Sequence, residues 1–376
     1  MTALPNFVVL YAAMYAAYGV ASPFLPSFLG SRGLSAEQLG MVLGAATAVR
    51  LVSAPLAGRI GDRLQALRVV LVVSIALAAF VTLGYLPARG FWLVLAVVLA
   101  HAAALAPMTV LSDALALGTS ARPPRFEYGW VRGTGSAAFI LGTLLSGQAI
   151  GAFGLDLIIA LQALLLGAAA LAAVRVPELP HPRAVDPNRN VLVLLRIARF
   201  RNLVLVAALI LGSHAMHDAF AVIRWSAAGI SSAVSSMLWS EAVAAEVLVF
   251  FLIGPALVSR LTPAGAMALA AAAGAVRWTV MAQSTEVVAL ALVQPLHGFT
   301  FALLHLACMR VLARTVPAGL EGTAQAFYAT VGVGVASALL TLASGALYGR
   351  LGADAFWFMA GLCALAFPLT LRLRGA

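Results

Sequence analysis

Five ionisable side chains interrupt long apolar runs in the second half of this sequence. They are Asp218, Glu241, Glu246, Arg277 and His297. A charged side chain in the hydrocarbon of a membrane costs at least ~2.5–3.5 kcal/mol, so such groups normally face a bundle interior or a water-filled cavity. In those places they mark the path of a substrate or a proton. The sequence therefore indicates a membrane transporter.

Composition predicts that membrane helices position these residues. Of the 376 residues, 63% are hydrophobic and only 10% are charged, whereas a soluble domain is about 45–50% apolar. A membrane-spanning helix needs about 20 apolar residues, and twelve stretches qualify. They cover residues 5–29, 35–57, 68–87, 90–117, 129–153, 155–176, 202–224, 231–258, 264–283, 285–314, 318–349 and 353–371. The predicted fold is an all-α membrane protein with twelve transmembrane helices.

The first apolar stretch is predicted to remain as a membrane helix. No basic segment precedes it and no small-residue cleavage site follows it, so it does not read as a signal peptide. Cys308 and Cys363 both lie inside predicted spans. We interpret them as small packing residues rather than as a disulfide framework.

The chain has 23 basic residues, all of them arginine, and a formal net charge of +10. Such an excess can indicate nucleic-acid binding, but most of these arginines fall in alternate loops between the predicted spans. This distribution is the positive-inside pattern. With an even number of spans it places both termini in the cytoplasm of a bacterial-type inner membrane. No nucleic-acid partner is predicted.

A polar, proline-bearing stretch at 177–200 divides the predicted spans into two sets of six. The halves, 1–176 and 201–376, repeat one another most clearly in their fifth spans. Thr143, Ser146, Gly147, Gly151, Gly154 and Asp156 recur in register as Thr341, Ser344, Gly345, Gly349, Gly352 and Asp354. Duplicated units with a site between them are what alternating access requires. We expect two pseudo-symmetric six-helix bundles joined by a cytoplasmic linker.

The loop after the second predicted span reads Gly58-Arg59-Ile60-Gly61-Asp62-Arg63. It is similar to the G-x-x-x-D-R loop of the major facilitator superfamily, which the chain resembles over essentially its whole length. The resemblance implies that Asp62 and Arg63 help to latch the cytoplasmic side. Gln65 stands where a glycine is usual, and the equivalent loop of the second half lacks the acid. A one-sided latch is therefore expected.

Further short segments occur in the expected order on the expected helices. They include Ser112-Asp113-Ala114-Leu115, Tyr128-Gly129-Trp130-Val131-Arg132, Trp239-Ser240, Val276-Arg277-Trp278 and Gln294-x-x-His297. Together they make the chain resemble the 3-phenylpropionate permease group and, more distantly, the lactose permease and the nucleoside:proton symporters. The resemblance implies a proton-coupled carrier of a small solute.

A substrate site is expected around Arg277. Arg277 and His297 resemble the arginine and histidine of the proton-coupling cluster of lactose permease, whose following glutamate is replaced here by Thr300. A planar guanidinium matches a carboxylate in two parallel hydrogen bonds. We expect Arg277 to bind a small aromatic carboxylate, with Gln294, His297 and Thr300 beside it. In the alternative, Arg277 pairs with Glu241 or Glu246, and the site binds a neutral nucleoside or sugar.

The candidate proton carriers are the acids of the second half. Glu241 and Glu246 are separated by roughly 140° around a helix, so they do not share one narrow face. Glu246 matches the phenylpropionate permease pattern, and Glu241 lies close to the position of the lactose permease glutamate. Asp218 is the third candidate. Asp218 and His214 share a helix face, but no further ligands cluster there, so no metal and no cofactor are predicted.

Two groups in the first half complete the candidate residues. Asp113 and Arg132 are predicted near the cytoplasmic ends of neighbouring spans, where they form either an ion pair at the inner gate or a substrate contact. Tyr11, Tyr15 and Tyr18 form an aromatic stripe on the first span. The first two are candidate cavity-lining residues, and packing or interfacial anchoring is the alternative for the stripe.

Three functions are open to a chain of this kind. The first is a proton symporter that imports a small organic solute and works as a monomer in the bilayer. The second is a proton-driven efflux antiporter, but such exporters resemble one another in a Gly-Pro motif of the fifth span, which here reads Gly133-Thr134-Gly135-Ser136. The third is a membrane enzyme or receptor, for which the sequence offers no nucleophile–base pair, P-loop or soluble domain. The symporter is favoured.

Overall fold

The computed structural model describes residues 3–179, 192–317 and 319–373. Within these ranges the chain is helical and contains no strand. The chain forms two compact units, Met1–Arg183 with Ser231–Met237 and Ala184–Ile230 with Leu238–Ala376. Most of the predicted linker, residues 180–191, lies outside the described residues.

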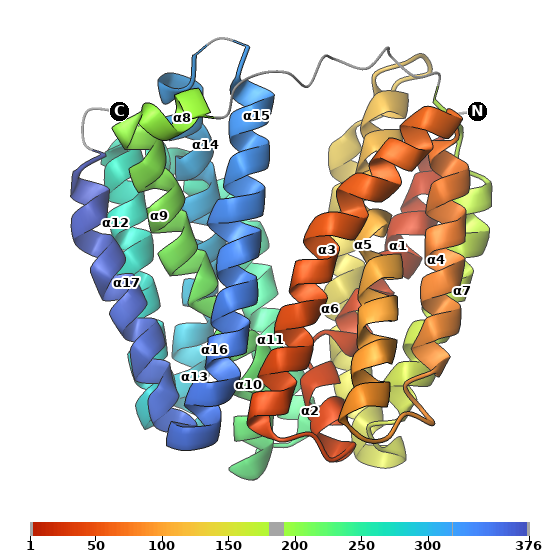
Figure 1. Ribbon diagram of the computed structural model, residues 1–376, viewed down its shortest axis with the longest axis horizontal. Coiled ribbons are helices and arrows are strands. Elements are labelled where there is room, and N and C mark those ends of the chain that lie inside the picture. Colours follow the sequence, from red (N-terminus) through yellow and green to blue (C-terminus); the bar gives the residue numbers. More distant parts are fainter. Residues whose placement is uncertain (1–2, 180–191, 318, 374–376) are drawn as a thin grey trace. The chain divides into compact units, whose positions relative to one another are not determined.

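The first unit is a bundle of apolar helices. Its elements are α1 (Leu4–Ala21), α2 (Leu25–Ser31), α3 (Ala36–Leu64), α4 (Leu67–Leu83), α5 (Phe91–Ser120), α6 (Tyr128–Phe153) and α7 (Leu157–Val174). Helix α1 packs against α6 and α7, whereas α4 packs against α5 and α7 and α3 packs against α5 (Figure 1). The helix α1 therefore packs against two neighbours, with its Phe7 and Tyr11 side chains in the core.

The ends of α3 follow from local sequence. At the N-terminus, the Ser35 hydroxyl accepts a hydrogen bond from the Gln38 backbone N–H, and the Ser35 backbone N–H donates one to the side-chain oxygen of Gln38, which is a capping box. At the C-terminus, Gln65 has φ 51° and ψ 40°, the left-handed conformation that glycine adopts most readily. The predicted latch residues Asp62 and Arg63 are exposed just before this turn.

Helices α1 and α6 approach closely because small residues line their contact. The Thr143 hydroxyl of α6 donates a hydrogen bond of 2.9 Å to the Gly19 carbonyl of α1. A Cβ atom added at Gly142 would lie 2.6 Å from the backbone oxygen of Ala16. Small residues at such contacts are the usual means of bringing membrane helices together.

Replacing Gly142 with alanine is expected to destabilise the first unit by about 1–3 kcal/mol, because the added methyl group meets backbone atoms that cannot move independently. The measurement is the thermal unfolding midpoint of the purified protein. Gly151→Ala is the matched control on the same helix, since a Cβ there meets nothing within 4 Å. Equal midpoints for the two variants would contradict this account of the α1–α6 contact.

The helices of the second unit are more often interrupted. Its elements are α8 (Leu192–Arg196), α9 (Ala198–Gly212), α10 (His214–Ala227), α11 (Ser232–Leu248, whose first residues group with the first unit), η1 (Val249–Ile253), α12 (Gly254–Gln283), α13 (Val287–Val293), η2 (Gln294–Leu296), η3 (Phe299–Leu303), α14 (Leu304–Thr315), α15 (Glu321–Phe327), η4 (Tyr328–Val335), α16 (Ala336–Leu351), η5 (Gly352–Ala355) and α17 (Phe356–Leu371). Helix α12 packs against α17, η3 and α14 (Figure 1).

Two prolines explain interruptions that bear on the site. Thr262 has φ 63° and ψ 161°, which kinks α12 immediately before Pro263, because proline disfavours helical geometry in the preceding residue. Pro295 lies in the 3₁₀ turn η2, and the wide turn η3 follows it. Wide helical turns of this kind often accompany functional sites. The irregular segment from Gln294 to Leu303 carries three of the predicted site residues.

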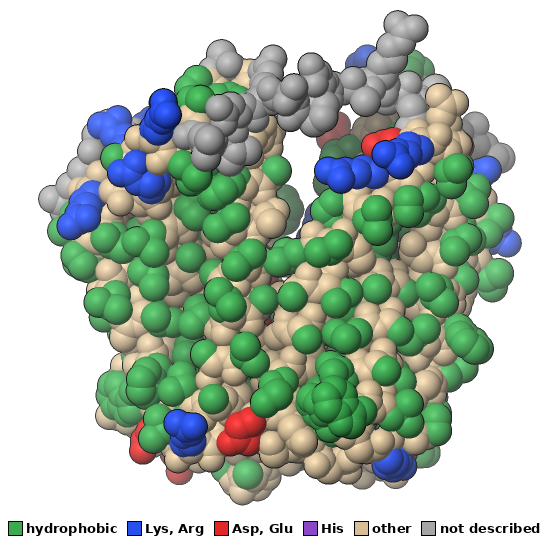
Figure 2. All heavy atoms as spheres, in the orientation of Figure 1, with side chains coloured by type: hydrophobic (Ala, Val, Ile, Leu, Met, Phe, Trp, Pro, Cys, Tyr) green, Lys and Arg blue, Asp and Glu red, His purple; other side chains and the backbone are tan. Residues whose placement is uncertain are grey.

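The surface of each unit suits a bilayer. In Figure 2, hydrophobic side chains cover the middle of the visible face of each unit, and charged side chains gather towards the ends. Within the described residues, nine helical stretches are long and apolar enough to cross a membrane, and two of them, Ser232–Gln283 and Glu321–Leu371, contain 52 and 51 residues. The chain is a multi-pass membrane protein, and the count of twelve spans stays a prediction.

Candidate functional site

The buried guanidinium of Arg277 is the centre of the candidate site. This side chain of α12 is 0% exposed. Its Nη1 donates to Nδ1 of His297 at 3.1 Å, and its Nη2 donates to Nε2 of His217 at 3.3 Å and to Oε1 of Gln294 at 2.7 Å. Gln294 and His297 come from the irregular segment after α13 and His217 comes from α10, so the fold has to bring these two parts of the second unit together around α12.

Arginine fixes the protonation of both histidines. A guanidinium is only a hydrogen-bond donor, so each imidazole must present a lone pair to it. His297 therefore carries its proton on Nε2, and His217 carries its proton on Nδ1. An imidazolium has no lone pair to offer, so both rings are neutral in this arrangement.

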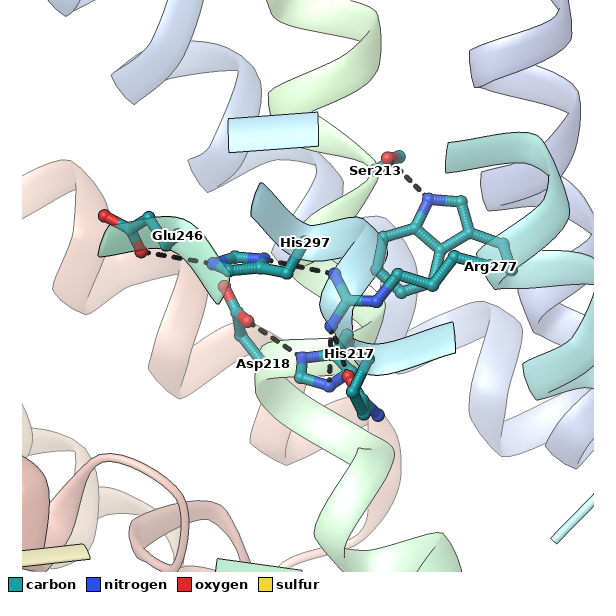
Figure 3. Close-up of polar contacts among 8 residues, drawn as sticks. Ser213, His217, Asp218, Glu246, Arg277 and His297 are labelled. Atoms are coloured by element: carbon teal, nitrogen blue, oxygen red, sulfur yellow. Dashed lines mark hydrogen bonds and ion pairs between the residues drawn. The ribbon is translucent and has the colours of Figure 1, made fainter. Parts of the chain in front are cut away.

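Each histidine points its remaining N–H at a carboxylate. Nε2 of His297 lies 3.4 Å from Oε2 of Glu246, and Nδ1 of His217 lies 3.3 Å from Oδ1 of Asp218. Figure 3 shows the two rings approaching Arg277 from different sides, with one acid beyond each ring. We name Arg277–His297–Glu246 the Glu246 branch and Arg277–His217–Asp218 the Asp218 branch.

The two branches differ in exposure. The Glu246 and His297 side chains are 29% and 17% exposed. In the other branch Asp218 is 63% exposed whereas His217 is buried. The acid of either branch is therefore more accessible than Arg277.

An aromatic shell holds the guanidinium in place. Arg277 lies over the ring of Trp278 at 4.6 Å from its centroid. The Trp278 indole donates a 2.8 Å hydrogen bond to the hydroxyl of Ser213, the residue between α9 and α10. His217 stacks on Trp239 with ring centroids 4.8 Å apart. Stacking and cation–π contacts orient the arginine without using its N–H groups.

Arg277 has donors to spare. Guanidinium carries five N–H groups, and the contacts to His297, His217 and Gln294 occupy three of them. The Nε atom is buried and lacks a hydrogen-bond partner within the described residues. No carboxylate of those residues lies within ion-pair distance, 4.0 Å, of Arg277. The ion pair with Glu241 or Glu246 that the sequence left open does not form in this structure.

The other predicted residues of the second unit occupy different positions. Gln294 is buried and holds Arg277 through its carbonyl, and its amide nitrogen lacks a partner among the described residues. Thr300 is buried and donates its hydroxyl proton to the His297 backbone at 3.1 Å, so it is used within the helix. Glu241 is half-buried on α11, five residues before Glu246.

A second polar group lies in the first unit. Oδ1 of Asp113 accepts hydrogen bonds from the hydroxyls of Tyr11 and, at 2.8 Å, of Tyr128. The Arg132 guanidinium lies over the Tyr15 ring at 4.8 Å from its centroid. The structure thus gives Asp113 two tyrosine partners and shows no Asp113–Arg132 ion pair among the described residues. Tyr11 is fully buried in the core, whereas Tyr15 is half-buried.

Comparison with known proteins identifies the family. A sequence model of the MFS_1 like family matches residues 4–359. The chain belongs to this family. It is 32% identical over 356 residues to the "Probable 3-phenylpropionic acid transporter" of Escherichia coli (strain K12), covering 93% of this chain and 92% of that protein. It is 21% identical over 369 residues to the "Uncharacterized transporter YwbF" of Bacillus subtilis (strain 168), covering 97% and 92% of the two chains.

Solved structures agree on the fold. A mutant of the nucleoside transporter NupG superposes with a TM-score of 0.88 at 15% identity, covering 99% of this chain and 100% of the other. The POT family transporter PepTSo superposes with a TM-score of 0.76 at 13% identity, covering 98% and 97%. Together with the family match and the E. coli relative, this fold makes the chain a membrane transporter of the major facilitator type. At these sequence identities the solved structures show the fold alone.

Sequence analysis of this MFS_1-like chain missed His217. It grouped Asp218 with His214 because the two lie four residues apart on a helix, but the structure pairs Asp218 with the adjacent His217. His214 packs edge-on against Trp278 instead. The consecutive His217-Asp218 pair within an apolar run was the available signal. Among the described residues, no group of three or more His, Cys, Asp or Glu is arranged to hold a metal ion.

Proposed function

We propose that this MFS_1-like transporter is a proton symporter that imports a small aromatic carboxylate by alternating access. The observation that carries the proposal is the buried Arg277 guanidinium, which has spare donors and no carboxylate partner among the described residues. A buried charge without compensation is unfavourable. A substrate carboxylate supplies that compensation through paired, charge-assisted hydrogen bonds.

The relatives support the choice of anion. The E. coli protein with 32% identity carries 3-phenylpropionic acid in its name, which describes an aromatic ring on a short carboxylic acid. Trp278 and Trp239 flank Arg277 and His217 in this chain. Aromatic faces beside a guanidinium suit a ligand with both an anionic group and an apolar ring.

The Glu246 branch supplies the coupling in this proposal. A proton that reaches His297 makes both ring nitrogens donors, so Nδ1 no longer accepts from Arg277. The Glu246 carboxylate, 3.4 Å away, stabilises the resulting imidazolium. Arg277 then turns the released Nη1 donor to the substrate. His297 is the partner to be displaced because it is partly exposed, whereas His217 and Gln294 are buried.

A neutral nucleoside or sugar is the second candidate substrate. The amide nitrogen of Gln294 is buried without a partner among the described residues and would donate to a carbonyl or hydroxyl oxygen. The fold is also that of the nucleoside transporter NupG. In this case Arg277 serves only to hold the two histidines.

The remaining sequence expectations belong to the same proposal. We propose twelve spans in two six-helix halves, 1–176 and 201–376, in a bacterial inner membrane with both termini in the cytoplasm and a monomer as the functional unit. The arginine-rich loops and the internal repeat support this arrangement. Asp62 and Arg63 are proposed to latch the cytoplasmic side, and Asp113 and Arg132 to act at the inner gate.

Ligand-dependent stabilisation tests the substrate class. We expect 3-phenylpropionate to raise the unfolding midpoint of the purified protein, and to do so more strongly at pH 6 than at pH 7, because binding takes up a proton. The neutral isostere 3-phenylpropionamide should have little effect, since it cannot compensate Arg277. Stabilisation by uridine or a sugar, with none by the carboxylate, would replace the proposal by the neutral-solute alternative.

A further inference from the structure

The Asp218 branch has the same chemistry as the Glu246 branch. In both, a neutral imidazole accepts a hydrogen bond from Arg277 and directs its other N–H to a carboxylate 3.3 or 3.4 Å away. The coupling described above uses only the Glu246 branch. It leaves His217 and Asp218 without a role.

We propose that the Asp218 branch is a second proton site, so that two protons enter with each carboxylate and transport is electrogenic. The inference rests on the proposed carboxylate symport and adds the stoichiometry to it. The proton passes from hydronium to an oxygen of Asp218, where an O–H bond forms and a water molecule is left. The same proton is released on the other side of the membrane.

The charges of the cluster favour two protons. Arg277 contributes one positive charge, and Glu246 and Asp218 contribute two negative charges. A monoanionic substrate adds a third negative charge. Because uncompensated charge is costly in a low-dielectric site, the favoured occupied state has the substrate paired with Arg277 and one proton on each branch. That state is neutral, whereas a single proton leaves a net charge of −1.

The surroundings of Asp218 allow it to exchange a proton. The side chain is 63% exposed, and an acid inside a membrane span faces a water-filled cavity rather than lipid. Its partner His217 is buried. The titratable and charged groups that act on Asp218 are His217 and His214 of α10, Arg277 of α12 and His297, which follows η2. All are bases. The positive charge of Arg277 therefore opposes protonation of Asp218. Substrate binding compensates this charge and lets Asp218 take up a proton.

The charge balance gives a direct experiment on the full-length chain. Two protons with one monoanion move one net positive charge inward, and one elementary charge across 100 mV corresponds to ~2.3 kcal/mol, which is about 50-fold in accumulation. In proteoliposomes with equal pH on both sides, a valinomycin–potassium potential of 100 mV, negative inside, is expected to accumulate radiolabelled 3-phenylpropionate by up to about 50-fold. Symport with one proton would show no accumulation under this condition.

Asp218→Asn removes the second site and keeps the size of the side chain. We expect this variant to lose accumulation driven by the potential and to retain accumulation driven by a pH gradient. Asp354→Asn is the matched control, because Asp354 is an exposed acid of the same unit at η5. The control should keep both responses, as should Asp218→Glu, which restores the acid.

The outcomes separate this inference from the proposed function. If the wild-type protein takes up no 3-phenylpropionate under a pH gradient, the proposed function fails. If uptake follows the pH gradient but not the potential, the symport stands and the second proton site is wrong. Potential-driven accumulation that persists in Asp218→Asn would also overturn the inference. Since the wild-type measurement decides by itself, a poorly folded variant does not leave the question open.

Discussion

Replacing Arg277 with lysine is expected to weaken binding of 3-phenylpropionate by roughly 100-fold, about 3 kcal/mol. The reason is a count of donors. Lysine has three N–H groups, and two acceptors, on His217 and Gln294, remain when His297 is protonated in the ligand-bound state. The variant keeps the charge but has one donor left for the ligand and cannot form the paired contact, whereas arginine keeps three. Titration calorimetry on the purified protein gives the affinity.

Two further variants make the Arg277 experiment specific. Arg277→Gln removes the charge as well and should weaken the carboxylate at least as much as lysine does. Arg350→Lys is the matched control, since Arg350 is exposed in the last turn of α16. Unchanged affinity for the carboxylate in both Arg277 variants would show that the guanidinium is not the partner of the anion. The neutral-solute alternative would then be favoured.

The residues of the candidate cluster were predictable because charge in an apolar run has few explanations. Arg277, Glu246, His297 and Asp218 stand out from their surroundings by composition alone, and each had to face a protein interior or water. Their convergence in the second unit agrees with this reasoning. Which partner each one takes was not predictable, because partners depend on the relative rotation of separate helices.

Arg277 shows why the partners could not be predicted from the sequence. Opposite charge suggested a partner among the glutamates, but the structure gives the guanidinium two neutral imidazoles and an amide. A histidine links the arginine to the acid, because the imidazole accepts a hydrogen bond from the arginine with one nitrogen and directs the N–H of the other nitrogen to the acid. Charge patterning alone does not reveal such an intermediate.

Asp113 shows the same effect in the first unit. The sequence placed it near Arg132 on an adjacent helix, but the hydroxyls of Tyr11 and Tyr128 bind its carboxylate. A tyrosine can serve for packing through its ring alone, so the sequence does not show which group its hydroxyl binds. Hydrophobic periodicity could not predict the irregular turns around Pro295 either. A proline within an apolar run indicates only that the helix is disturbed there.

Replacing Glu246 with glutamine is expected to remove one proton from the transport cycle. Glutamine is close to glutamate in size and keeps an oxygen beside Nε2 of His297, but it carries no charge to stabilise an imidazolium. His297 should then stay neutral and keep its hold on Arg277. We expect accumulation of 3-phenylpropionate under a pH gradient of one unit to fall about tenfold, since each coupled proton contributes one factor of ten per pH unit.

The dependence of the binding affinity on pH detects the same coupled proton without a transport assay. For the wild-type protein, affinity for 3-phenylpropionate should rise as the pH falls, and in Glu246→Gln the slope should decrease by one proton, about tenfold per pH unit. Glu286→Gln is the matched control because Glu286 is exposed beside the N-terminus of α13. Glu241→Gln shows which acid of α11 is responsible. If the slope falls in Glu241→Gln and is unchanged in Glu246→Gln, the Glu246 branch does not carry the coupled proton, and the 3.4 Å contact between Glu246 and His297 has only a structural role.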